Sequence, residues 1–222
     1  KVARWDKVFD TRYTSMARFA GDANLNINAG GVNASLFYRI IQPDYTSLGT
    51  YYMANNYHSV GASLGTTLFR RVSVAATFSA QEDNLSNKQL YTTRGFVYSA
   101  FIATRIANRL NLSFGYNGYL QTQADGTAHV NDTTRVRRAM NTFTFTPSYA
   151  VDNDQFGHAF SLSASLVQNK DLNRFATGVS DVTSLAIGAS YGLEVKAWKT
   201  SFQTSINHQS SKGFNTRYTS DL

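Results

Sequence analysis

Long stretches of this chain alternate between one apolar residue and one small polar residue. The alternation is cleanest over residues 110–121. There the apolar row is Leu110, Leu112, Phe114, Tyr116 and Leu120, and the polar row is Asn111, Ser113, Gly115, Asn117 and Gln121. Successive side chains of a β-strand point to opposite faces, so this pattern predicts a strand with one apolar and one polar face.

The same pattern recurs along the whole chain and predicts about ten strands. They are expected over residues 17–29, 32–40, 57–69, 72–79, 94–106, 110–121, 142–149, 160–166, 184–193 and 198–207. Short turns fall near residues 30, 70, 108, 154 and 195, and longer polar loops lie between them. No segment shows helical periodicity. Short and long connections that alternate in this way are typical of outer-membrane β-barrels.

The composition fits strands whose polar face is neutral. Charged residues make up only 16% of the chain, against about 25% in average proteins. The polar rows consist mainly of Ser, Gly, Thr, Asn and Ala, whereas a soluble sheet usually exposes Lys and Glu. We therefore predict an all-β chain that forms a transmembrane antiparallel up-and-down β-barrel. The alternative is a soluble β-sandwich or lipocalin-like barrel that fills its core with the apolar rows.

Several other classes of protein fit the sequence poorly. The formal charge is +7, but the basic residues are scattered and form no patch or helical stripe, so we expect no nucleic-acid partner. The chain has no cysteine, which excludes disulfides and thiolate metal sites. No apolar run reaches the roughly 18 residues of a membrane-spanning helix.

One segment carries a resemblance to a known group of proteins. Residues 41–56 read IQPDYTSLGTYYMANN, and Glu82-Asp83-Asn84-Leu85 follows the next hairpin. Both segments resemble large outer-membrane β-barrel proteins of Bacteroidota. The resemblance implies a barrel in the outer membrane and a partner in outer-membrane lipid, and it implies no particular activity.

The parity of the strands predicts which residues face lipid and which face the lumen. Six apolar positions are expected to face lipid: Leu112, Phe114, Leu162, Leu185, Ile187 and Phe202. Four charged positions fall on the polar parity: Arg18, Asp22, Arg39 and Arg105. These charges either pair with one another and stiffen or plug the lumen, or they form a constriction that favours anions.

The sequence offers no catalytic, cofactor-binding or metal-binding constellation. His58 and His158 are expected on the apolar rows near strand ends, and His129 and His208 in loops. No EF-hand spacing, phosphate-binding loop or dinucleotide fingerprint occurs. We therefore predict a non-enzymatic protein without cofactors.

The resulting functional hypothesis is a pore, a transporter or a membrane component of an envelope complex in the bacterial outer membrane. One alternative is a plugged scaffold subunit of a secretion or assembly machine, with other envelope subunits as partners. Another is an outer-membrane lipid-modifying enzyme or protease. Residues 1–222 are expected to form one barrel domain, in which residues 1–16 are a loop-like lead-in and residues 208–222 an extracellular loop or tail.

The strand directions lead to one further expectation. If the short turns lie in the periplasm, both ends of the chain lie outside the cell, whereas a bacterial barrel normally begins and ends in the periplasm and has an even number of strands. We therefore expect a barrel of 12 or more strands, of which this chain supplies about ten.

Overall fold

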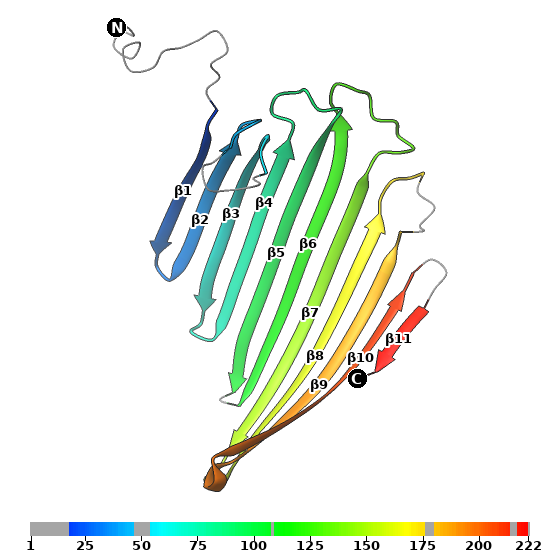
Figure 1. The fold of residues 1–222 in the computed structure, drawn as a ribbon. Helices are drawn as coiled ribbons and strands as arrows, with labels where there is room; N and C mark the ends of the chain where they lie inside the picture. Colours follow the sequence, from blue (N-terminus) through cyan, green and yellow to red (C-terminus); the bar gives the residue numbers. More distant parts are fainter. Residues whose placement is uncertain (1–17, 47–53, 108, 176–179, 214–216, 222) are drawn as a thin grey trace.

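Eleven strands form a single antiparallel sheet in the computed structural model, which describes residues 18–46, 54–107, 109–175, 180–213 and 217–221 (Figure 1). Each strand pairs with its neighbours in the sequence, so the topology is up-and-down throughout. The strands are β1 Ala20–Ala29, β2 Val32–Ile41, β3 Tyr57–Leu68, β4 Val72–Asp83, β5 Tyr91–Ala107, β6 Leu110–Asp125, β7 Arg137–Asp152, β8 Phe156–Asp171, β9 Val182–Val195, β10 Thr200–Lys212 and β11 Arg217–Asp221.

The prediction of an all-β chain with an up-and-down antiparallel sheet is confirmed. The described residues contain no α-helix, only the 3-10 turn η1 at Lys196–Trp198 between β9 and β10. Among these residues, no helix has the length and apolarity to cross a membrane. The sheet is open, because β1 and β11 each pair on one side only in the described part of the chain. Closure into a barrel is therefore not shown.

The strands extend further at the long-loop end than the sequence predicted. β5 has 17 residues, and β6, β7 and β8 have 16 each. The tail prediction for residues 208–222 is wrong over most of its length, because β10 continues to Lys212 and Arg217–Asp221 form β11. The extra residues are mostly polar on both faces, so apolar periodicity gave no sign of them.

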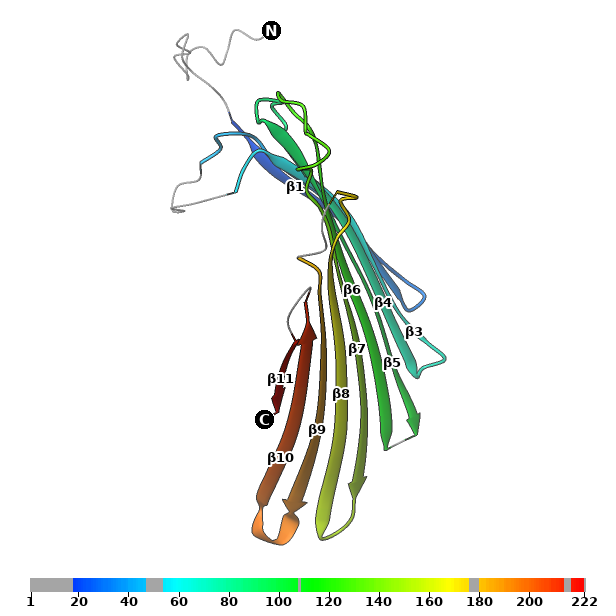
Figure 2. The same cartoon turned by 90° about the vertical axis from the view of Figure 1, so that its right-hand side faces the viewer.

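The hairpins are staggered along the sheet. At the short-turn end β3 runs two residues beyond its last pairing with β2, from Thr66 to Leu68. β7 runs three residues beyond its last pairing with β6, from Tyr149 to Asp152. The turns consequently step down across the sheet in one direction (Figure 1). The sheet is also twisted and curved along its strands (Figure 2).

The sheet has almost no interior. The only buried hydrophobic residues in the described ranges are Ile41, Val130 and Val195, and no large side chain there is fully buried. A single sheet with nothing packed on it leaves both of its faces accessible. Any function of the fold must therefore use these faces or the ends of the sheet.

Candidate functional site

The register of the sheet divides its side chains into two faces. Residues directly opposite one another on an antiparallel pair point to the same side. One face, here the apolar face, includes the run of directly paired residues Ala29, Val32, Thr66, Val74, Ile102, Phe114, Phe145, Ala164, Ile187 and His208. The other, the polar face, includes the run Asn26, Ser35, Ser63, Thr77, Ser99, Asn117, Thr142, Val167, Ser184 and Ser211.

The six residues predicted to face lipid all lie on the apolar face. Leu112, Phe114, Leu162, Leu185, Ile187 and Phe202 come from β6, β8, β9 and β10. Nothing in the described chain covers them: Leu185 is 40% exposed and Phe202 56% exposed. Full burial of one such side chain is worth about 1.5–3 kcal/mol. Transfer of the apolar face from water to an apolar environment would therefore be strongly favourable.

The uncharged part of the apolar face has a limited height. On β6 it runs from Leu110 to Leu120, which at about 3.4 Å per residue spans roughly 34 Å. A strand tilt of about 40° would reduce this height to roughly 26 Å. The apolar band of an outer-membrane barrel is about 25 Å tall. The band on this sheet thus has a height that fits a bilayer.

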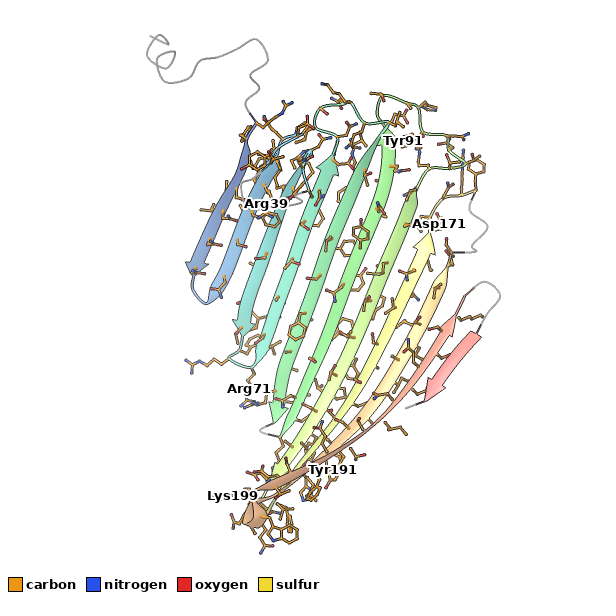
Figure 3. The ribbon with its side chains drawn as sticks, in the orientation of Figure 1. Arg39, Arg71, Tyr91, Asp171, Tyr191 and Lys199 are labelled. Atoms are coloured by element: carbon orange, nitrogen blue, oxygen red, sulfur yellow. The ribbon has the colours of Figure 1, made fainter. Side chains whose placement is uncertain are left out.

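Charged and aromatic residues mark the two ends of this band. At the long-loop end Arg94 Nε donates to Glu82 Oε2 at 2.9 Å, both on the apolar face beyond the band. Within the band the rings of Tyr98 and Tyr116 lie 5.7 Å apart. At the short-turn end the rings of Phe160 and Tyr191 lie 4.7 Å apart. Figure 3 shows Tyr191 near the short turns.

Hydroxyl groups bond to one another across the polar face. Ser35 and Ser63 lie 2.6 Å apart through their Oγ atoms, as do Ser161 and Ser190, and Ser184 and Ser211 lie 2.8 Å apart. Thr77 Oγ1 and Ser99 Oγ lie 2.7 Å apart. This face satisfies its small polar groups across the strands without charge.

The predicted lumen charges separate into different places. Arg39 Nε donates to Asp22 Oδ1 in an ion pair on the polar face of β1 and β2. Arg18 precedes β1, and its guanidinium lies 3.3 Å from Asp44 Oδ2 in the loop after β2. Arg105 lies at the short-turn end of β5 and donates to Asn111 Oδ1 at 3.1 Å. The structure therefore does not bring the four residues together.

Two charged residues that the sequence reasoning placed in loops belong to the polar face instead. Arg138 lies near the start of β7, on the polar face, and pairs directly with Asp171 at the end of β8. Direct cross-strand pairing links Arg138 and Asp171 to the Asp22–Arg39 ion pair. The paired residues form one row across the polar face, here called the charged row: Asp22, Arg39, Ser59, Gln81, Gly95, Gln121, Arg138 and Asp171. Figure 3 shows Arg39 and Asp171 toward the same end of the sheet.

The charged row stands apart from the rest of the polar face. The next four paired rows toward the short turns contain no Asp, Glu, Lys or Arg in the described strands, until Arg105 at the opposite end. A charge on the polar face is thus close to one rim or the other. The pairing register reveals this arrangement, which the sequence alone could not supply.

Hydrogen bonds hold the described parts of two long loops, the one between β6 and β7 and the one after β8. Asn173 Nδ2 donates to the carbonyl oxygens of Asp132 and Arg135 at 3.0 and 2.9 Å, which ties two loops together. Asp125, at the end of β6 beyond the apolar band, accepts from the Val130 amide at 3.0 Å. This bond, together with the contact to His129, lowers the pKa of Asp125 below its usual range.

The histidines are dispersed. His158 Nδ1 lies 2.8 Å from the Tyr191 hydroxyl on the apolar face, and His129 Nδ1 lies 2.6 Å from Asp125 in a loop. The prediction that His208 lies in a loop is wrong, because it is part of β10 opposite Ile187. The described residues include no group of three or more His, Asp or Glu side chains with metal-binding geometry.

Comparison with known proteins gives no relative from which to transfer a role. No family model matches the chain, and neither a curated protein nor a solved structure is significantly similar to it. The resemblance to Bacteroidota outer-membrane barrels therefore stays a prediction from the sequence.

Proposed function

We propose that this chain forms the wall of an outer-membrane β-barrel that acts without catalysis, as a pore, a transporter or the membrane component of an envelope complex. One observation carries the proposal. Across β1 to β10 an uncovered apolar face lies back to back, in register, with a polar face whose charges lie near its two rims. A barrel wall in a bilayer needs this division, with apolar residues toward lipid and polar residues toward water.

A soluble sandwich or lipocalin-like barrel fits the observations less well. Such a fold covers the apolar side of its sheet with a second layer or by closing around a core. Every described strand of this chain belongs to the same sheet, so none remains to form a covering layer. The stagger of the hairpins favours a closed barrel over a sandwich, because closed barrels require tilted and staggered strands. The scarcity of charge on the polar face in turn disfavours a lipocalin-like barrel, whose polar face would be its outer surface.

The proposal requires that the free edges of β1 and β11 find partners. Unpaired backbone amides and carbonyls cost several kcal/mol each in the hydrocarbon of a membrane. Further strands must therefore join the edges and bring the barrel to 12 or more strands. Outer-membrane lipid is then the medium of the apolar face, and other envelope subunits are the expected protein partners.

A plugged scaffold is the second candidate. It is favoured by the bonds of Asn173 to the loop between β6 and β7 and by the Asp22–Arg39 pair, which fixes one charge of the polar face to another. A scaffold of a secretion or assembly machine needs the apolar face but no open lumen. The two candidates therefore share the wall and differ only in conduction.

Reconstitution into liposomes separates the candidates. We expect the full-length protein to float with the lipid and to resist extraction by alkaline carbonate, because its apolar face is inserted. An open pore also conducts ions in a planar bilayer, whereas a plugged scaffold inserts and stays silent. A protein that remains in the soluble fraction would contradict both candidates.

A further inference from the structure

A groove runs across the polar face and includes the central residues of the charged row. It has a volume of about 380 Å³, and its lining comes from the polar face of β2 to β6. Small residues form its floor: Ser59, Ser79 and Gly95. Phe37 on β2 and Tyr119 on β6 stand at its two sides. A volume of this size is within the range of small-molecule sites.

Both aromatic side chains at the sides of the groove are held in place by neighbouring glycines. The Phe37 ring lies so close to Gly61 that no Cβ would fit there, and a Cβ on Gly61 would also lie 2.7 Å from the Phe78 carbonyl oxygen. The Tyr119 ring lies against Gly95, within 3.5 Å of where a Cβ would be. The Phe37 ring is thus packed tightly against the backbone, the Tyr119 ring makes an ordinary van der Waals contact with it, and both rings line the groove.

A second groove continues the first across β7 and β8. It has a volume of about 350 Å³ and shares Tyr119 and Gln121 with the first. Arg138, Met140 and Asn169 of the polar face also contribute to it. The two grooves therefore meet at Tyr119, and an elongated ligand could occupy both.

Three polar side chains along the grooves are free to bind a ligand, whereas Asp83 and Asp171 already accept hydrogen bonds from neighbouring residues. Within the described residues, the side-chain amides of Gln81 and Gln121 and the hydroxyl of Tyr119 have no hydrogen-bond partner. An amide supplies both donors and acceptors, which matches a hydroxyl group. The charged row contributes two arginines and two aspartates, so it has no net charge.

We propose that these joined grooves bind a neutral oligosaccharide, with Tyr119 as the central stacking surface and Gln81 and Gln121 as hydrogen-bonding residues. Flat aromatic surface beside groups that both donate and accept suits sugar rings, which have apolar faces and hydroxyl edges. An inorganic anion is less suited, because Asp83 adds negative charge at the edge of the first groove. The proposal rests on the proposed barrel in one respect: there the grooves line the lumen, and the sugar is cargo.

The test is calorimetric titration of the full-length protein, in detergent, with maltohexaose, xylohexaose and chitohexaose. At least one is expected to bind saturably. The Tyr119→Ala variant should bind that sugar about tenfold more weakly, a loss of about 1.4 kcal/mol. Gln121→Ala is a second variant that removes polar contacts with little change to the fold. Tyr98→Ala is the matched control, since Tyr98 is at the same level of the neighbouring strand but on the apolar face.

Each outcome decides the proposal. If none of the three sugars binds, or if citrate or spermidine binds where the sugars do not, the proposal is wrong. It is also wrong if a sugar binds equally well to Tyr119→Ala, Gln121→Ala and the wild type. Insertion into liposomes is measured on the same protein preparation. Sugar binding without insertion refutes the barrel alone, and insertion without sugar binding refutes the saccharide site alone.

Discussion

The apolar face and the polar face are the two sides of one sheet, and their side chains differ in the contacts that they make within the chain. On the polar face, hydroxyl groups pair across strands, as Ser161 does with Ser190 at 2.6 Å. On the apolar face, large side chains such as Leu162 and Ile206 find no cover, and Ile206 is 66% exposed. The hydroxyl groups of the polar face are therefore largely satisfied within the chain, whereas the apolar side chains have no cover in its described part. The difference is the basis for proposing that the apolar face contacts lipid and the polar face contacts water and solutes.

The largest expected effect comes from placing a charge on each face in turn. Leu162→Arg should lower the free energy of unfolding in lipid by about 2–4 kcal/mol, because it places a cation in hydrocarbon. Ser163→Arg, one residue along β8 and on the polar face, should cost much less. Urea unfolding in liposomes, followed by tryptophan fluorescence, measures both. Equal losses would remove the distinction between the faces.

The second effect concerns crowding within the polar face. Gly61→Ala should destabilise the protein by about 1–3 kcal/mol, because the new methyl group meets the Phe37 ring and the Phe78 carbonyl oxygen. Gly65→Ala, on the same strand and face, has no atom within 4 Å of its new Cβ and should be nearly neutral. The same unfolding assay compares them. A neutral Gly61→Ala would show that the Phe37 wall of the groove is loosely packed.

Much of this two-faced sheet could be predicted from the sequence, and the failures have a common cause. The alternation from Leu110 to Asn117 is strict because large apolar residues occupy only one face there, and it is interrupted once, at Gly118 and Tyr119. Beyond that band both faces become polar, as at Arg137 and Arg138, and the alternation disappears although the strand continues. The ends of the strands, β11 and half of the charged row were therefore not predicted. Cross-strand register also depends on pairing between distant segments, which periodicity does not encode.

The third effect is electrical and applies if the lumen conducts. Arg138→Ser should shift the reversal potential in a salt gradient away from anions, because it removes one cation from the charged row. Asp22→Asn should shift it the other way. Arg71→Ser is the control, since Arg71 lies at a short turn far from the row (Figure 3). Identical reversal potentials in all three variants would mean that the row does not control selectivity.

The smallest effect is a dependence of one loop on pH. The pKa of Asp125 is lowered in the folded protein, so its bonds stabilise the loop above the ordinary carboxyl pKa of about 3.9. This stabilisation is lost as the pH falls through the lowered value. Hydrogen exchange at the Val130 amide should therefore be slow at pH 5 and should accelerate in stronger acid, beyond the intrinsic change in rate. Asp125→Asn should abolish this acid-dependent step.

Site-directed labelling tests most directly whether the apolar face contacts lipid. The chain contains no cysteine, so single cysteines can be placed at Phe114 and Leu185 on the apolar face and at Ser113 and Ser184 on the polar face. In liposomes, a lipid-soluble maleimide should label the first pair and a water-soluble maleimide the second. If both pairs react equally with both reagents, the apolar face is not in lipid and the proposed barrel is wrong.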